Sequence, residues 1–352
     1  QEDGSADLSA VLHVAKQLGD CLPSHYCVVI NKSTVPVGTA EAVRQAITEK
    51  ATSEFDVVSN PEFLREGHAI KDFMEPERLV VGVDSQRAEE VMRSLYDSFV
   101  DDDRRLHVTN PATAELSKYA ANTFLITKIS FMNEIAQLCE RMGADVDMLR
   151  HILGSDSRIG PKFLYPGIGV GGSCFPKDIR ALKHMADKYD YDFKLIKAAM
   201  AINDQQQYVL VTKLKDHFDN DINDKKFALW GLAFKPHTDD IREAPALVII
   251  DELVKAGARV AAYDPEAAER VRKLYVNDER IKIVADKYEA LEGANALIIA
   301  TEWPEFADSN LGRISQALKQ PLVFDGRNIF KPATMQKAGF SYHSIGRRPV
   351  VQ

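Results

Sequence analysis

The chain has 352 residues, 45% of them hydrophobic and 27% charged, which is the composition of an ordinary globular enzyme with room for two or three domains. Lys and Arg total 44 against 52 Asp and Glu, giving a net charge of −8, and no strongly basic stretch occurs. These values argue against a nucleic-acid partner, and the lack of an apolar run of about 18 residues argues against a membrane span.

The first 110 residues alternate between helical and strand-like patterns. Hydrophobic spacing predicts helices over residues 7–18 and 38–51 and strands over residues 26–34, 55–60 and 78–83. This alternation predicts a parallel sheet with right-handed crossovers. Because the unit begins on a helix and has few strands, we expect it to lack its opening half.

Residues 111–218 read as an all-helical block. Helical periodicity runs from Pro111 to Gly143, a predicted C-cap, and further helices are predicted over 145–153 and 176–188. The amphipathic run over 193–218 is unusually long for a helix of a globular protein.

A second α/β unit begins at Lys225. Strands are predicted in "KFALWGLAF", "RVAAYDP", "ANALIIAT" and "PLVFDG", and Gly257 closes the helix "APALVIIDELVKAG". The predicted fold class is therefore α/β, with two Rossmann-like parallel-sheet domains, the first incomplete, joined by a helical block with a long central helix. The predicted domains are residues 1–110, 111–218 and 225–352.

The stretch "GIGVGGSCFPKD" (167–178) places Cys174 after a glycine-rich loop and just before a predicted helix. The helix N-terminus and the neighbouring Lys177 would both favour the thiolate, so we favour a reactive thiol over a core cysteine. The glycines formally match G-x-G-x-x-G. No buried strand precedes them and no acidic residue closes a second strand about twenty residues later, so we reject a dinucleotide phosphate loop.

Other polar groups carry weaker signals. Asn60 and Pro61 suit the start of a helix, which would put Glu62 and Glu66 on one helix face, either for acid/base chemistry or facing water. Lys118 and Asn122 share a helix face, where a solvated lysine is the favoured interpretation. Polar loops follow two later strands and carry three cations: Lys235, Arg242 and Arg327. These cations either bind the phosphates of a nucleotide or form a charge cluster on the surface.

The four cysteines, Cys21, Cys27, Cys139 and Cys174, are too scattered for a disulfide framework and form no metal-type C-x-x-C pair. We therefore expect no metal site and a reduced, cytoplasmic setting. The opening residues "QEDG" carry neither a basic nor an apolar region, so we expect no signal peptide.

Together these segments closely resemble the UDP-glucose/GDP-mannose dehydrogenase family. The matching motifs follow the family's order and span essentially the whole chain: "DGSADLSAV", "KSTVPVGT", "NPEFLREG", "AELSKYAANTF", "GIGVGGSCFPKD", "GLAFKPHTDDIREAP" and "DGRNIF". "GGSCFPKD", "WGLAFKP" and "TEWPEF" look most like the branch that oxidises UDP-glucose.

The resemblance implies an NAD-dependent, four-electron oxidation of a sugar C6 alcohol to a carboxylate, with Cys174 forming a thiohemiacetal and then a thioester. It also implies roles for a set of further residues. Lys118 and Asn122 would steady the oxyanion, Asp178 and Glu62 would handle water and protons, and Thr34 would lie near the cofactor and the catalytic water. Cofactor contacts are implied for Ser33, Thr34, Glu66 and Arg242.

Nucleotide-sugar contacts are implied for a larger set: Glu62, Phe63, Leu64, Lys118, Asn122, Arg158, Tyr165, Gly167, Gly169, Gly171, Phe234, Lys235 and Arg327. Arg158 corresponds to an arginine that reaches a neighbouring subunit's substrate, so the resemblance implies a homodimer through residues 111–218. Family members open with a βαβ unit that carries the NAD loop, and the chain is expected to lack this half. A GDP-mannose or UDP-N-acetylhexosamine dehydrogenase, and a UDP-sugar-binding fragment without activity, remain as alternatives.

Overall fold

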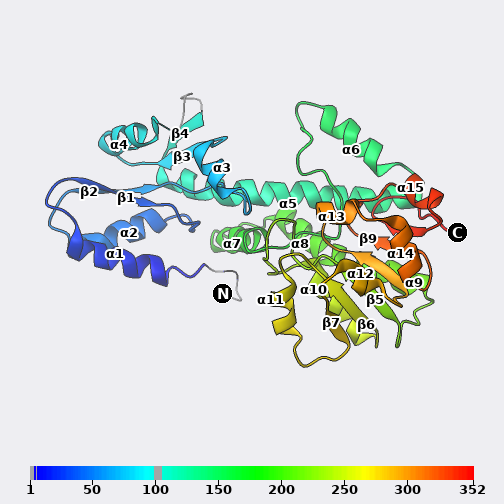
Figure 1. The fold of residues 1–352 in the computed structure, drawn as a ribbon. Coiled ribbons are helices and arrows are strands. Elements are labelled where there is room, and N and C mark those ends of the chain that lie inside the picture. Colours follow the sequence, from blue (N-terminus) through cyan, green and yellow to red (C-terminus); the bar gives the residue numbers. More distant parts are fainter. Residues whose placement is uncertain (1–3, 5, 99–104) are drawn as a thin grey trace. The chain divides into compact units, whose positions relative to one another are not determined.

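The computed structural model describes Gly4, residues 6–98 and residues 105–352, and the chain forms two compact units (Figure 1). Unit 1 comprises Gln1–Phe124 and Lys177–Phe193, and unit 2 comprises Leu125–Pro176 and Lys194–Gln352. Asp3 and Ser5 of the motif "DGSADLSAV" lie outside the described residues. The division into three domains stays a prediction, while the α/β class with a helical middle block is confirmed.

Unit 1 contains a four-stranded sheet in the order β1-β2-β3-β4. Its strands β1 and β2 pair in parallel, as do β3 and β4, but β2 and β3 are antiparallel, so the prediction of a parallel sheet is wrong for that pair. The connection between β2 and β3 contains only the short helix α3 (Ala69–Met74), which buries no residue. No crossover helix therefore covers the sheet between them, and the chain returns alongside β2. The strands are β1 Cys27–Asn31, β2 Phe55–Ser59, β3 Leu79–Gly82 and β4 Leu106–Thr109.

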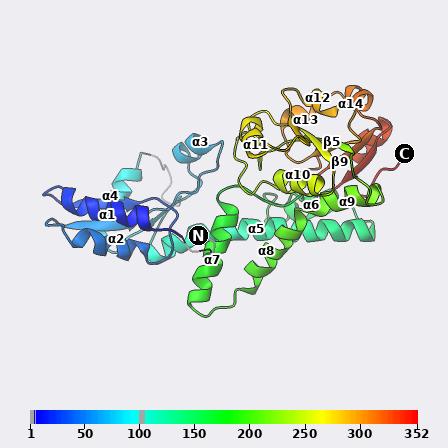
Figure 2. The same ribbon diagram turned by 90° about the horizontal axis from the view of Figure 1, so that it is seen from below.

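Helices cover both faces of this sheet. α1 (Ser9–Cys21) and α2 (Thr39–Thr48) lie side by side, as both views show (Figures 1 and 2). Val57 packs in the cluster under α1 and α2, whereas its neighbour Val58 packs with α4 (Gln86–Tyr96). Successive strand residues point to opposite faces, so β2 serves both cores.

The helical block begins with α5 (Pro111–Met142), and Gly143, at φ +73°, ends it as predicted. α6 (Val146–Ser155) and α7 (Phe175–Lys188) follow. The run over 193–218 is not one helix but two, α8 (Lys194–Gln206) and α9 (Val209–His217). Gln206 is fully buried and its side chain bonds to Gly167, which fixes the end of α8 against another segment of unit 2.

Unit 2 contains a six-stranded sheet in the order β10-β9-β8-β5-β6-β7, with every neighbouring pair parallel. Phe227 and Leu229 of β5 face the cluster that includes α9 and α10 (Pro245–Lys255), and Ala228 and Trp230 face the opposite cluster. The sheet thus lies between two helical layers (Figure 1). The strands are β5 Lys226–Trp230, β6 Arg259–Tyr263, β7 Ile281–Ile283, β8 Ala296–Ile299, β9 Leu322–Asp325 and β10 Ser341–Ser344.

The strand order of unit 2 reverses at β5, which lies between β6 and β8. In open α/β sheets, ligands bind outside the carboxyl ends of the strands at such a switch point. The loops after β5 and β9 carry Phe234 and Arg327 to this edge. The remaining helices are α11 Ala268–Leu274, α12 Lys287–Leu291, α13 Pro304–Ala307, α14 Leu311–Ala317 and α15 Pro332–Lys337. Within the described residues, no helix combines the length and apolarity needed to cross a bilayer.

Candidate functional site

Lys118 of α5 is buried in unit 1 and paired with a carboxylate. Only 4% of its surface is exposed, and its Nζ lies 3.0 Å from Glu62 Oε1. The favoured interpretation of a solvated lysine is therefore wrong. The ring of Phe63 lies 5.4 Å from this ammonium and 4.0 Å from the guanidinium of Arg78. A buried cation held by one carboxylate and one aromatic face is suited to stabilising a negative charge on a ligand.

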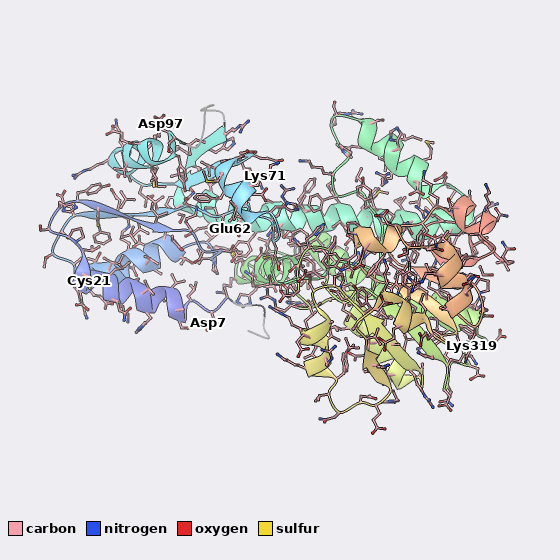
Figure 3. The ribbon with its side chains drawn as sticks, viewed as in Figure 1. Asp7, Cys21, Glu62, Lys71, Asp97 and Lys319 are labelled. Carbon is pink, nitrogen blue, oxygen red and sulfur yellow. The ribbon has the colours of Figure 1, made fainter. Side chains whose placement is uncertain are left out.

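The segment after β2 is an extended loop and not the predicted helix. Asn60 is buried and ties the loop to the sheet, because its amide donates to Val80 O at 2.8 Å and its oxygen accepts from Lys32 Nζ at 3.0 Å. The next helix begins only at Ala69, so Glu62 and Glu66 do not share a helix face. Glu62 is half-buried and lies between β2 and α3 (Figure 3). The helix-start signal of Asn60 and Pro61 was outweighed by the hydrogen bonds that the Asn60 side chain makes with neighbouring segments.

Asn122 and Asp178 form a second buried pair in unit 1. Asn122 Nδ2 donates to Asp178 Oδ2 at 2.6 Å, and Lys177 Nζ lies 2.9 Å from Oδ1. Asp178 is only 1% exposed, in the first turn of α7. Burial, aided by the charges of Asp178 and Glu115, raises the pKa of Tyr119 beyond its usual range. A buried carboxylate with an amide partner is equipped to orient a water molecule or to hold a proton.

Glu115, which the sequence analysis did not single out, joins three segments of unit 1. Its carboxylate accepts from Gly38 N at 2.7 Å, Ala40 N at 2.8 Å and Ser59 Oγ at 3.0 Å. It therefore caps the N-terminus of α2 from α5 and fixes the loop that follows Ser33 and Thr34. Burial raises the pKa of Glu115, and these hydrogen bonds oppose the shift. Its position one turn before Lys118 was the only available sequence signal.

The carboxyl edge of β1 has features that fit a dinucleotide. Asn31, the last residue of β1, carries a buried amide nitrogen with no partner among the described residues, while its oxygen accepts from Ser33 N at 3.2 Å. Ser33 is exposed and Thr34 is half-buried in the loop that continues from it. Donors and hydroxyls at the carboxyl edge of parallel strands are the groups that a pyrophosphate or ribose requires. These residues therefore fit NAD.

The glycine loop of unit 2, residues 165–172, is held by side-chain amides of α5 and α8. Asn133 accepts from Gly167 N at 2.9 Å, and Gln206 donates to Gly167 O at 2.6 Å. Asn203 accepts from Val170 N at 2.8 Å, and Gly172 N donates to the carbonyl of Arg242 at 2.8 Å. Asn203 and Gln206 are three residues apart, so their side chains lie on one face of α8. The sequence could not show that this face contacts the glycine loop.

Cys174 follows this loop directly and is exposed, and α7 begins at the next residue. The predicted placement at a helix N-terminus is confirmed. The Ser173 hydroxyl lies 3.6 Å from the Cys174 sulfur. Cys139, by contrast, is 3% exposed in the core of unit 2, and burial raises the pKa of its thiol. An exposed thiol at the positive end of a helix is suited to nucleophilic attack.

Phe234, Lys235 and Arg327 gather at the carboxyl edge of the unit 2 sheet. Arg327 Nη1 donates to Gly169 O at 3.3 Å and Nη2 to Phe234 O at 3.5 Å, and Lys235 Nζ lies 5.2 Å from the Phe234 ring. Asp264, at the end of β6, supports this edge with a carboxylate that accepts five hydrogen bonds, from the backbone N–H groups of Leu232, Ala233, Glu266 and Ala267 and from the indole of Trp303.

The other predicted contact residues of unit 2 lie on its surface. Arg158 is 86% exposed and bidentate to Asp156. Arg242 pairs with Asp240 at 2.7 Å. Tyr165 is exposed, with the Arg150 guanidinium 4.2 Å from its ring centre.

Models of the UDP-glucose/GDP-mannose dehydrogenase family match the chain in three segments: the NAD binding domain over residues 1–100, the central domain over 112–205 and the UDP binding domain over 228–332. The chain is 47% identical to UDP-glucose 6-dehydrogenase of Pseudomonas aeruginosa, covering 98% of this chain and 78% of that one. It is also 47% identical to UDP-glucose 6-dehydrogenase TuaD of Bacillus subtilis, covering 99% and 74% respectively.

Among solved structures, a UDP-glucose dehydrogenase from Pyrobaculum islandicum superposes with a TM-score of 0.88 at 34% identity, covering 97% of this chain and 76% of that one. These matches extend over both units. The chain therefore belongs to the UDP-glucose/GDP-mannose dehydrogenase family.

Proposed function

We propose that the chain oxidises UDP-glucose to UDP-glucuronate, with Cys174 as the nucleophile. The observation that carries the proposal is the exposed thiol at the N-terminus of α7, directly after a rigid glycine loop that also contacts Arg327. Two relatives named UDP-glucose 6-dehydrogenase are 47% identical over nearly the whole chain, which supports this substrate over GDP-mannose.

The chemistry follows from the groups that the chain supplies. A bound NAD would supply the hydride acceptor for C6 in each of the two oxidations. After the first, the Cys174 sulfur adds to the aldehyde carbon, and the former carbonyl oxygen becomes a hydroxyl as the thiohemiacetal forms. The second oxidation turns that carbon into a thioester. Water then adds to it, the C–S bond breaks, the Cys174 thiol is regenerated, and the carboxylate is released as product.

The two polar pairs of unit 1, Lys118 with Glu62 and Asn122 with Asp178, would act in these steps. Lys118, with its ammonium held by Glu62, would stabilise the negative oxygen of the adducts, and Asn122 would support it. Asp178, fixed by Asn122, would orient the hydrolytic water. Ser33, Thr34, Glu66 and Arg242 would contact the cofactor, and Phe63 and Leu64 the sugar. Phe234, Lys235, Arg327, Tyr165 and the glycine loop would hold the UDP portion, as the family resemblance implies.

The test is a stoichiometric assay of the chain with NAD and UDP-glucose. We expect two NADH for each UDP-glucuronate and at least about tenfold lower kcat/KM with GDP-mannose or UDP-N-acetylglucosamine, because a sugar that misplaces C6 loses its alignment with the thiol. If the chain oxidises GDP-mannose or UDP-N-acetylglucosamine faster than UDP-glucose, then that sugar is its substrate and UDP-glucose is not. Calorimetric binding of UDP-glucose without NADH formation would identify a binding protein instead.

A homodimer through the helical block is proposed together with this function. Large apolar side chains of α5 and α6 are strongly exposed, with Phe131 at 52%, Leu138 at 46%, Met142 at 72% and Ile152 at 57%. Phe131, Leu138 and Met142 are spaced seven and four residues apart, so they form one stripe on α5, as in helices that pair with a partner. A dimer would bring Arg158 to a neighbouring subunit's substrate. The cytoplasmic location stays a prediction from the scattered cysteines.

Leu138→Asp is expected to convert the dimer to a monomer, because a carboxylate in the middle of an apolar interface is left without a partner. Sedimentation equilibrium of the purified chain measures this directly. Val276→Asp, at a residue that is 74% exposed after α11, is the matched control and should leave the mass unchanged. A wild-type chain that is monomeric at micromolar concentration would disprove the interface.

A further inference from the structure

Three turns of sequence Asp-x-Arg in unit 2 share one geometry: residues 156–158, 240–242 and 278–280. In each turn the aspartate Oδ1 accepts the backbone N–H of the arginine at 2.9 to 3.0 Å. The guanidinium then returns to the same carboxylate, through Nε at 2.8 to 3.0 Å and through Nη2 at 2.5 to 2.7 Å. Each of these arginines is thereby paired with the aspartate of its own turn.

The turn Asp325-Gly326-Arg327 begins in the same way and then departs from this geometry. Asp325 Oδ1 accepts the Arg327 N–H at 2.9 Å, but the guanidinium points elsewhere. Its Nε donates to Ala300 O at 2.8 Å, and its two terminal nitrogens reach the carbonyls of Gly169 and Phe234. The side chain thus lies along the carboxyl edge of β8 and against the glycine loop. The four turns have the same sequence spacing and the same backbone hydrogen bond. The different direction of the Arg327 guanidinium must therefore come from its surroundings.

The difference lies at the other oxygen of Asp325. Oδ2 accepts the Tyr342 hydroxyl at 2.8 Å and the Phe330 N–H at 3.1 Å, so the site that Nη2 takes in the other turns is already filled. Tyr342 comes from β10, the neighbour of β9, and both Tyr342 and Asp325 are fully buried. Burial raises the pKa of Asp325, whereas the hydrogen bond from Arg158 lowers the pKa of Asp156. The two carboxyl groups therefore experience opposite surroundings.

We propose that Tyr342 and Asp325 are positioning residues for Arg327. Because Tyr342 occupies the Asp325 carboxylate, the guanidinium of Arg327 does not bond to it and is directed to the diphosphate of the nucleotide sugar. The inference rests on the proposed function, since it deepens how the UDP portion is bound. A guanidinium already bonded to its own carboxylate would have to break that pair before meeting a phosphate, and Arg327 is spared this cost. Glu302, 44% exposed and 3.3 Å from Nε, is the competing explanation for the direction of Arg327.

The first test is Tyr342→Phe, read by calorimetric titration with UDP. Loss of the hydroxyl leaves Oδ2 with only the Phe330 N–H among the described residues, so one acceptor position opens to Arg327. We therefore expect the Kd for UDP to rise about tenfold, which is typical for losing one charge-assisted hydrogen bond. The KM for UDP-glucose should rise equally while kcat changes by less than about twofold. Tyr263→Phe removes a hydroxyl from the same sheet, where it donates to Glu305 at 3.2 Å, and should leave the Kd unchanged.

A double-mutant cycle separates positioning from general damage. If Tyr342 acts through Arg327, Tyr342→Phe has no further effect on the Kd in an Arg327→Ala background. An equal loss in both backgrounds overturns the proposal. A wild-type chain that binds no UDP contradicts the proposed function instead.

Glu302→Gln is a second test of the proposal. It can be carried out even if Tyr342→Phe fails to fold, because Glu302 lies on the surface. An unchanged Kd for UDP supports positioning from the buried side of the turn. A Kd raised about tenfold would show that Glu302 directs Arg327, and would overturn the proposal.

Discussion

Replacing Cys174 by serine is expected to lower the rate of UDP-glucuronate formation by about 10⁴-fold or more, the scale seen when a covalent nucleophile is removed. A serine hydroxyl at neutral pH is a far weaker nucleophile than a thiolate. The first oxidation does not need the sulfur, so the variant should still bind UDP-glucose with a Kd within about threefold of the wild type. Product analysis by chromatography, together with calorimetric titration, measures both quantities.

Cys21→Ser is the matched control for this experiment. Cys21 is also an exposed free cysteine, and it lies at the end of α1 (Figure 3). Its replacement should leave the rate of acid formation within about twofold of the wild type, as expected for a surface substitution. Undiminished UDP-glucuronate formation by the Cys174→Ser variant would exclude the thioester route.

Gly171→Ala is expected to reduce kcat/KM for UDP-glucose by at least about 100-fold and to lower the stability of unit 2. A Cβ at this position would lie 2.2 Å from the carbonyl oxygen of Glu243 and 2.8 Å from its carbon, so the backbone of the loop must move. A shift of about 1 Å in the segment preceding Cys174 is enough to misalign the thiol and a bound substrate. Steady-state kinetics and urea unfolding of the same preparation separate the loss of activity from the loss of stability.

Gly160→Ala isolates the effect of the clash from the effect of losing a glycine. Gly160 has φ +70° and nothing within 4 Å of an added Cβ, so the variant suffers only the conformational strain of about 1 kcal/mol. It should keep nearly full activity. Equal kinetic losses in the two variants would mean that the close approach of the loop to Glu243 has no bearing on catalysis.

The sequence predicted those parts of the molecule in which local pattern and tertiary structure agree. The strands β1, β2 and β3 of unit 1, the strands β5, β6, β8 and β9 of unit 2 and the long helix ending at Gly143 follow from periodicity and capping, and Cys174 follows from its position before a helix. The short strands β4, β7 and β10 were not predicted. Lys118 could not be placed correctly, because its burial depends on Glu62, 56 residues away, and helical spacing carries no information on that pairing.

Two of the wrong predictions, the helix after Asn60 and the single helix over 193–218, share one physical origin. Asn60 was expected to cap a helix, but its side chain bonds to Lys32, just after β1, and to Val80 of β3. The run over 193–218 was read as continuous, but Gln206 turns inward to Gly167. In each case a polar side chain finds a distant partner, and that bond outweighs the local propensity. Glu115, Asp264 and Asp325 were missed for the same reason.

The hydrogen bonds that hold the loop of residues 165–172 affect the free energy of ligand binding. A chain rich in glycine has many conformations to lose, about 1–2 kcal/mol for each residue that becomes fixed. Here the carboxamides of Asn133, Asn203 and Gln206 impose that order during folding. The entropic penalty is thus already met before a nucleotide arrives, and more of the contact energy of the loop remains available for affinity.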